Sequence, residues 1–201
     1  MRDFLSIISY LFHPIFIPVG GTIAYFLITP KHTPIEVQGG NILPIFILTV
    51  IIPMVTYLIL KNIGMVHTIF IATATERKYP VAIHLILLLL ILYKVIPNNY
   101  IVEVYYYFVG LAGASITCLV LLFFNVRASL HLVGVGGLLM YLITLSVHFE
   151  TNIVIAISIF ICITGLVASS RLYLKALTKP ELIIGFCIGI ISQLLTVTYW
   201  L

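Results

Sequence analysis

Charged residues are scarce in this chain of 201 amino acids. Asp, Glu, Lys and Arg together make up 8% of it, against about 25% in an ordinary soluble domain. Hydrophobic residues reach 62%, and the mean hydropathy is +1.24. This balance excludes a water-soluble globular domain and predicts a polytopic membrane protein.

Cysteine and strand-like patterning are equally sparse. The three cysteines, at positions 118, 162 and 187, all lie inside apolar runs, where we expect small buried hydrophobes without a disulfide or metal role. Ten-residue units of alternating polarity are absent, which argues against an outer-membrane barrel. We therefore expect a helical protein with no metal and no cofactor.

Long apolar runs dominate the sequence instead. A helix needs about 20 apolar residues to cross the hydrocarbon, and breaks at charge, proline and asparagine leave seven such segments. They cover residues 4–29, 42–60, 80–96, 102–125, 130–148, 152–170 and 182–201. The first contains HPIFIPVGG, whose two prolines favour a bent or re-entrant segment, and the count would then fall to six. The predicted fold class is an all-α integral membrane protein, with six to seven transmembrane helices in one bundle that forms a single domain over residues 1–201.

The few charges are divided unevenly between the two membrane faces. If every segment crosses once, Lys31 and Lys94 fall on one face and eight basic residues fall on the other. The eight are Arg2, Lys61, Arg77, Lys78, Arg127, Arg171, Lys175 and Lys179. The positive-inside rule explains this split by anchoring alone, and would make the richer face cytoplasmic. His32, His148 and Glu150 fall on the poorer face, where we expect interfacial positions.

Three short polar clusters stand out on the basic face. They are TERKYP at 75–80, VRASLH at 126–131 and SRLYLKALTKPE at 170–181, each two crossings from the next. Guanidinium groups suit phosphate oxygens because they donate two parallel, charge-assisted hydrogen bonds. His131 begins a helix at the polar boundary, where a proton donor can reach an ester oxygen. The pattern favours a phosphate site, although anchoring or an interfacial histidine accounts for each cluster taken singly.

These clusters resemble the three-part signature of the phosphatidic acid phosphatase type 2 superfamily of membrane lipid phosphatases. SR at 170–171 matches the third part, ASLH at 128–131 keeps the serine and histidine of the second, and RKYP at 77–80 resembles the end of the first. The chain is also similar to a divergent bacterial branch that opens with a segment like YLFHPIFIP. The resemblance implies phosphate-binding roles for Arg77, Lys78, Arg127, Ser129, Ser170, Arg171 and Lys175.

One departure from the signature bears on catalysis. The resemblance implies a nucleophilic histidine six residues past Arg171 and a partner aspartate four further on, but the sequence has Leu177 and, at the partner position, Glu181. Leucine has no lone pair to attack phosphorus, so covalent catalysis there is chemically impossible. Three alternatives remain: His131, the candidate acid or base, itself attacks and leaves no obvious general acid; His67 moves into the site; or the protein hydrolyses nothing. We favour the third, because residues of such a site act as a unit.

The expected function is that of a degenerate lipid phosphatase-like protein, a pseudoenzyme of the bacterial inner membrane that binds a lipid or isoprenoid phosphate head group. The alternative is a noncatalytic integral membrane subunit that scaffolds a larger complex with another membrane protein. A small transporter is a third, and would need ionisable residues along its crossings, where His84 is nearly alone. No nucleic-acid partner is expected. Active members of the superfamily imply an external site, which we adopt as the expectation, whereas the charge count places the clusters inside.

Overall fold

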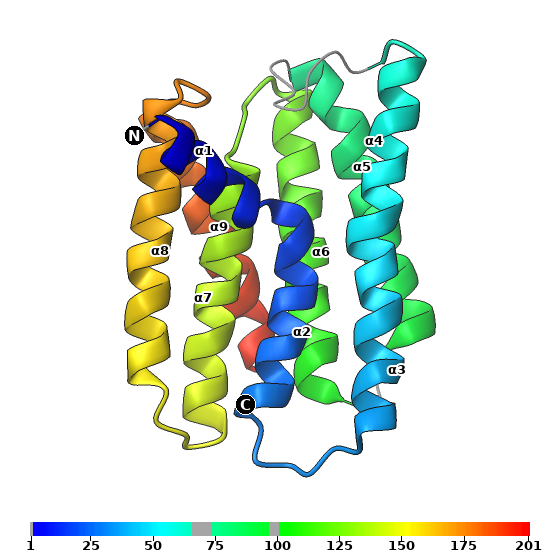
Figure 1. Cartoon of the computed structure of the whole chain (residues 1–201), viewed down its shortest axis with the longest axis vertical. Coiled ribbons are helices and arrows are strands. Elements are labelled where there is room, and N and C mark those ends of the chain that lie inside the picture. The colour runs from blue at the N-terminus through cyan, green and yellow to red at the C-terminus, as the bar shows by residue number, and fades with distance from the viewer. Residues whose placement is uncertain (1, 66–73, 97–100) are drawn as a thin grey trace.

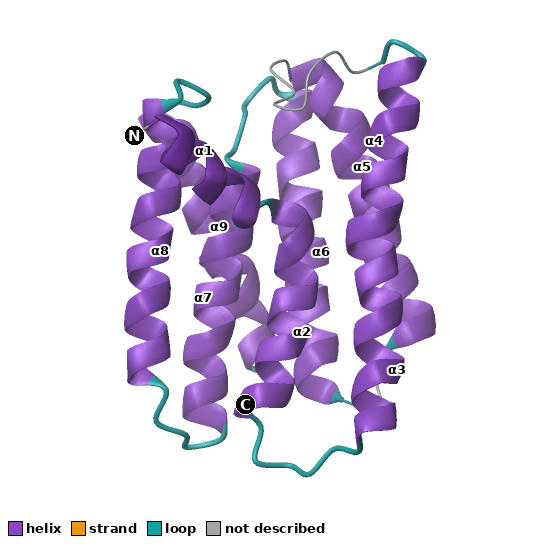
Figure 2. Cartoon of the chain, viewed as in Figure 1, coloured by secondary structure: helices purple, strands orange, loops and turns teal. Residues whose placement is uncertain are grey.

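The computed structural model describes residues 2–65, 74–96 and 101–201, and within them every regular element is helical (Figure 1, Figure 2). In chain order the elements are α1 (Arg2–Leu11), η1 (Pro14–Phe16), α2 (Ile17–Ile28), α3 (Ile35–Phe46), η2 (Ile47–Ile51), α4 (Ile52–Asn62), α5 (Ala74–Leu90), η3 (Ile91–Val95), α6 (Val102–Phe123), α7 (Leu130–His148), α8 (Val154–Tyr173) and α9 (Lys179–Val197). The elements η2 and η3 are π-helical turns that continue the neighbouring α-helices, whereas η1 is a short 3-10 turn.

Seven stretches of the described chain are helical, long and apolar enough to cross a membrane. They are Asp3–Ile28, Ile35–Asn62, Glu76–Val95, Val102–Phe123, Leu130–His148, Val154–Tyr173 and Lys179–Val197. Each overlaps one of the predicted segments, so the all-α prediction is confirmed for the described residues, and the seven stretches have the length and hydropathy of membrane-crossing helices. Large apolar side chains on the outer faces, such as Ile155 at 79% exposure on α8, fit a lipid surrounding.

The first stretch is broken, as its prolines predict. The chain leaves the helical path after α1, and His13 caps the short turn η1 by accepting a hydrogen bond from the backbone N–H of Ile15 at 3.4 Å. Figure 1 shows α1 inclined across the upper end of the bundle while α2 runs along it. Helix α2 has 12 residues and rises about 18 Å at 1.5 Å per residue, which is short of the hydrocarbon thickness of about 30 Å.

Helix α7 lies at the centre of the bundle and packs most closely against α9. Glycines allow this approach: Gly137 on α7 faces the backbone of Gly189 on α9, with only 3.5 Å between the position of an added Cβ and the Gly189 carbonyl oxygen. Beside this contact, Tyr107 of α6 stacks on Tyr141 of α7 at 4.2 Å between ring centroids. Small residues thus allow α7 and α9 to pack tightly against each other.

The three basic clusters lie at one end of the bundle, as the number of crossings between them predicts. The start of α5, the α6–α7 connection and the α8–α9 connection are all at the upper end in Figure 1. The connections at residues 29–34 and 149–153 are at the lower end. The fold thus separates two polar regions by the length of the bundle.

Candidate functional site

A cavity of about 870 Å³ reaches into the bundle from the end that carries the clusters. Its wall is mainly apolar and comes from α1, η1, α4, α5, α6 and α7, with Arg171 and Leu177 added from the end of α8 and the following loop. The polar side chains with an ionisable group that line it include Arg77, Arg171 and His131. None of the described lining residues is Asp or Glu, so the wall carries net positive charge.

Arg171 is almost completely buried, at 3% exposure, in the last turn of α8. One of its terminal nitrogens donates a hydrogen bond to the Ser9 hydroxyl oxygen on α1 at 2.9 Å. The adjacent Ser170, which is fully buried, donates from its hydroxyl to the Leu5 carbonyl oxygen at 2.6 Å. Ser170 therefore ties α8 to α1 and is not a cavity residue, whereas Arg171 is.

His131 lies in the first turn of α7 and shares Ser9 with Arg171. Its Nε2 is 3.1 Å from the Ser9 carbonyl oxygen and 3.5 Å from the Ser9 hydroxyl. The ring also meets His13 edge-on, with 5.3 Å between centroids. Ser129 acts two residues earlier as the N-cap of α7, where its hydroxyl accepts from the Leu132 N–H at 3.4 Å. The second cluster thus supplies one polar cavity residue, His131, and one helix cap, Ser129.

The first cluster contributes Arg77 and not Lys78. Arg77 is 7% exposed, lines the cavity, and donates to the Ala128 carbonyl oxygen at 3.5 Å. The Lys78 ammonium lies 4.7 Å from the centroid of the Phe123 ring on α6, in a cation–π contact outside the cavity lining. Successive residues of a helix point about 100° apart, so only one of this pair can face the cavity.

Two further predicted phosphate-binding residues, Arg127 and Lys175, lie outside the cavity, as does Glu181 at the predicted partner position. Arg127 forms an ion pair with Glu181, with 2.7 Å between Nε and Oε1. Glu181 also completes the capping box of α9, because its carboxylate accepts from the Thr178 N–H and hydroxyl at 2.7 and 2.9 Å. Lys175 is exposed and has a left-handed backbone, with φ of 51°, just after α8. Arg127 and Glu181 therefore stabilise the start of α9, and Lys175 lies in the turn that follows α8.

Leu177 stands in the cavity wall at the position where the resemblance implies a nucleophile. It is 7% exposed and packs in an apolar cluster with Leu5, Leu132, Val167 and Leu182. An aliphatic side chain is therefore well accommodated at this place, and the packing accounts for its stability there.

The sequence reading missed Ser9 and His13 as cavity residues and noted His84 only as a nearly lone ionisable residue within the crossings. All three line the cavity. The HPIFIP segment was the signal available, because a broken first segment places polar residues against the bundle instead of in lipid. His67, the other histidine considered, lies outside the described residues.

Two guanidinium groups and several imidazoles thus meet an apolar chamber, which suits an amphiphile with an anionic head. Hydrolysis is a different matter. Displacement at phosphorus needs the attacking and leaving groups in line on opposite sides, and His13 and His131 touch each other, which leaves no room for a phosphoryl group between them. Among the described residues, no group of three His, Cys, Asp or Glu side chains is arranged to hold a metal ion.

Comparisons of the chain with protein-family models, with curated proteins and with solved structures gave no match.

Proposed function

We propose that this chain is a degenerate lipid phosphatase-like protein that binds the phosphate head group of a lipid or isoprenoid with little or no hydrolysis. The proposal includes a bundle like that of the phosphatidic acid phosphatase type 2 superfamily and a place in a bacterial inner membrane. The observation that carries it is the convergence of Arg77, His131 and Arg171, from three separate clusters, on one mainly apolar cavity.

The charge of the cavity supports a phosphate ligand. Arg77 and Arg171 are both buried, and burying a charge is costly unless it is hydrogen-bonded and balanced. A phosphomonoester brings about two negative charges at neutral pH. Two guanidinium groups match that charge and can each donate a pair of parallel hydrogen bonds to it.

The shape of the cavity supports an apolar tail on that ligand. Leu11 on α1 and Leu58 on α4 line the cavity, yet they are 64% and 58% exposed on the outside of the bundle. The cavity therefore reaches the outer surface between α1 and α4, at a place that faces lipid in a membrane. A head group can lie against the arginines while its chain remains in the hydrocarbon.

Leu177 supports binding without turnover. An isopropyl group cannot form the phosphohistidine that the resemblance implies, and the contact between His13 and His131 leaves neither ring free to attack in line with the other. Loss of the group that forms the covalent bond removes nearly all of such catalysis, because the remaining residues act only together with it.

Binding is tested with the purified protein in detergent and with phosphatidic acid, phosphatidylglycerol phosphate and an isoprenyl diphosphate as ligands. Arg77→Ala and Arg171→Ala should each weaken binding about 10- to 100-fold, since a hydrogen bond to a charged group contributes about 1.5–3 kcal/mol. Lys78→Ala and Lys175→Ala are matched controls, because each removes a neighbouring cation outside the cavity. Equal losses in all four variants would indicate unspecific attraction to a basic face and would contradict the proposal.

Hydrolysis is tested by phosphate release from the same three ligands. We expect none above the level of protein-free controls. Release that His131→Ala abolishes would show a working phosphatase and would refute the pseudoenzyme part. Lipid binding unaffected by Arg171→Ala, together with a stoichiometric membrane protein that copurifies, would favour the scaffold alternative.

A further inference from the structure

A second cavity, of about 710 Å³, lies at the opposite end of the bundle and has a buried carboxylate in its wall. Glu103 is in the first turn of α6 and is only 3% exposed. The cavity is bounded by residues 31–34, by the start of α6, by the end of α7 and by residues 198–201. A buried carboxylate is expensive unless donors surround it, so what holds Glu103 indicates what the cavity accepts.

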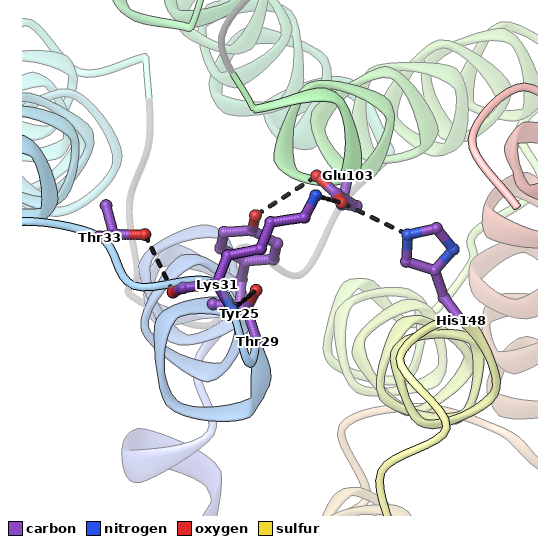
Figure 3. Close-up of polar contacts among 6 residues, drawn as sticks. All are labelled: Tyr25, Thr29, Lys31, Thr33, Glu103 and His148. Carbon is purple, nitrogen blue, oxygen red and sulfur yellow. Dashed lines mark hydrogen bonds and ion pairs between the residues drawn. The ribbon is translucent and has the colours of Figure 1, made fainter.

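Three donors from different elements converge on Glu103 (Figure 3). The Lys31 ammonium lies 2.5 Å from Oε1, and His148 Nε2, at the end of α7, lies 3.4 Å from the same oxygen. The Tyr25 hydroxyl donates to Oε2 at 3.4 Å. Figure 3 shows Lys31 and Tyr25 approaching from one side and His148 from the other. The carboxylate is thus a fixed and fully oriented acceptor.

The Lys31 ammonium occupies a binding position formed by the Glu103 carboxylate and the Phe149 ring, here called the ammonium seat. Its nitrogen lies between the Glu103 carboxylate and the face of the Phe149 ring, 5.4 Å from the ring centroid. A carboxylate and an aromatic face are the two surfaces that attract an ammonium ion most strongly. The Lys31 side chain is itself 58% exposed and stands on the connection between α2 and α3. A long, exposed side chain of this kind can exchange one anionic partner for another.

A tryptophan in the wall of this cavity carries a buried N–H donor that has no acceptor among the described residues. Trp200 lines it and is 9% exposed, and its indole Nε1–H has no hydrogen-bond partner among the described residues. A buried N–H without a partner costs free energy that an incoming acceptor would recover. His32 also lines the cavity and is exposed at its rim. One seat therefore accepts an ammonium, and the surrounding side chains donate to an acceptor.

We infer that this cavity binds the head group of a phospholipid that carries both a primary ammonium and a phosphate, as phosphatidylethanolamine does. The ammonium of the lipid takes the seat on Glu103, and Lys31 turns to the lipid phosphate, which also accepts from the indole N–H of Trp200. The Lys31–Glu103 ion pair of the protein and the ammonium–phosphate pair of the head group thus exchange partners. Every charge keeps a partner, and no net charge is buried.

Other head groups fit this exchange less well. An anionic head group alone would bring a phosphate next to Glu103 without replacing Lys31, so two anions would share one cation. A simple amine would release Lys31 with no new anion. A trimethylammonium group has no N–H to donate to the carboxylate and is bulkier than the ammonium now in place. The inference concerns residues and a membrane face apart from those of the proposed function, and does not depend on it.

Trp200 is the single tryptophan of the chain, so its fluorescence reports on this cavity directly. The purified protein in detergent is titrated with phosphatidylethanolamine, phosphatidylcholine or phosphatidylglycerol as mixed micelles, and with soluble glycerophosphoethanolamine. We expect a saturable change in emission with phosphatidylethanolamine and none with the other two lipids. A response to the lipid alone assigns the membrane as the source, and a response also to the soluble compound assigns the head group chemistry itself.

Variants then separate the seat from general effects. Glu103→Gln should weaken the phosphatidylethanolamine response about tenfold or more, because a hydrogen bond to a charged acceptor becomes a neutral one. Lys31→Met empties the seat, so this variant should respond to ethanolamine alone, to which the parent chain does not. Lys94→Met is the matched control, since it removes an exposed lysine that does not line the cavity and should change nothing.

Equal responses to phosphatidylcholine or phosphatidylglycerol, or no response to any lipid, would overturn the inference. Unchanged affinity in a folded Glu103→Gln variant would do the same. If that variant does not fold by circular dichroism, Lys31→Met decides alone. A Lys31→Met protein that ignores ethanolamine as the parent does would show that the seat is not an ammonium site.

Discussion

The close contact of α7 with α9 makes Gly189→Ala a sharp test of the packing that positions the candidate site. A Cβ at this residue would lie 2.2 Å from the Val133 carbonyl oxygen, 2.7 Å from the Gly137 nitrogen and 3.0 Å from the Val133 carbonyl carbon. All three are backbone atoms of α7, so no side-chain rotation can make room. The two helices must move apart.

The size of the effect follows from two opposing contributions. Overpacking a well-packed interior costs about 1–3 kcal/mol, and a clash with backbone belongs at the upper end of that range. Alanine recovers about 0.5–1 kcal/mol over glycine in a helix interior. The net loss is therefore about 2 kcal/mol, which lowers the unfolding midpoint of a chain of this length by about 4–8 °C.

Gly165→Ala on α8 is the matched control, because no heavy atom would lie within 4 Å of its added Cβ. Only the helix propensity acts there, so we expect a midpoint equal to that of the parent chain or slightly higher. Both variants are followed by circular dichroism during heating in one detergent. A Gly189→Ala midpoint at or above that of Gly165→Ala would refute the helix contact on which this reasoning rests.

Three variants probe the candidate site further. Leu177→His places an imidazole in the cavity wall, and phosphate release from phosphatidic acid should appear where the parent chain gives none. If this variant also releases no phosphate, the result would count against the proposed likeness to the lipid phosphatase site. Gly185→Ala brings a Cβ within 2.6 Å of the Ser129 carbonyl oxygen at the start of α7, and phosphatidic acid should bind about tenfold more weakly as that end shifts. Ser9→Ala removes the acceptor 2.9 Å from Arg171, a charge-assisted bond of about 1.5–3 kcal/mol, so the unfolding midpoint should fall by about 3–12 °C. An unchanged midpoint would show that this hydrogen bond is unimportant to the fold.

The membrane-spanning helices were predictable because hydropathy acts along the chain, over about 20 residues at a time. Their ends were less so. The second crossing begins at Ile35 and not near position 42, because the polar Gln38 and Asn41 are accommodated in the helix. Asn41 donates to the Val37 carbonyl one turn earlier, and Gln38 donates to the Thr33 carbonyl just before the helix. Local pairing of polar side chains with the backbone is not visible in a count of apolar residues.

The sequence predicted that Arg77 and Arg171 lie at the same end of the bundle, but not that both line one cavity. An even number of crossings returns the chain to the same face, which places Arg77 and Arg171 at one end of the bundle. Which of two neighbouring cations faces the cavity depends on the rotation of α5 about its axis. The sequence alone therefore could not distinguish Arg77 from Lys78, and the packing of α5 on α6 decides between them. For Ser9 the broken first segment was the only signal, because its bond to Arg171 follows from the inclination of α1 across the bundle.

Glu103 shows the same limit at the opposite end. An acidic residue in the first turn of a helix is ordinarily a solvated partner of the helix dipole. Its burial results from residues far away in the sequence, Lys31 and His148, which reach it only after the bundle has formed. The sequence reading placed both residues on the poorer face, with His148 as an interfacial residue, and did not connect either of them with Glu103.

Under the proposed function, Glu181 and Leu177 differ from the two buried arginines in what they do for the fold. At the position where the resemblance implies an acid that orients a histidine, Glu181 caps α9 and pairs with Arg127, away from the cavity. Leu177 meanwhile joins the apolar packing between α1, α7 and α9. Both positions thus stabilise the ends of helices, a role that needs no phosphate. Arg77 and Arg171 form hydrogen bonds to Ala128 and Ser9, but a buried guanidinium also costs desolvation that hydrophobic residues of the same size avoid. Under the proposed function, a bound anion would offset this cost.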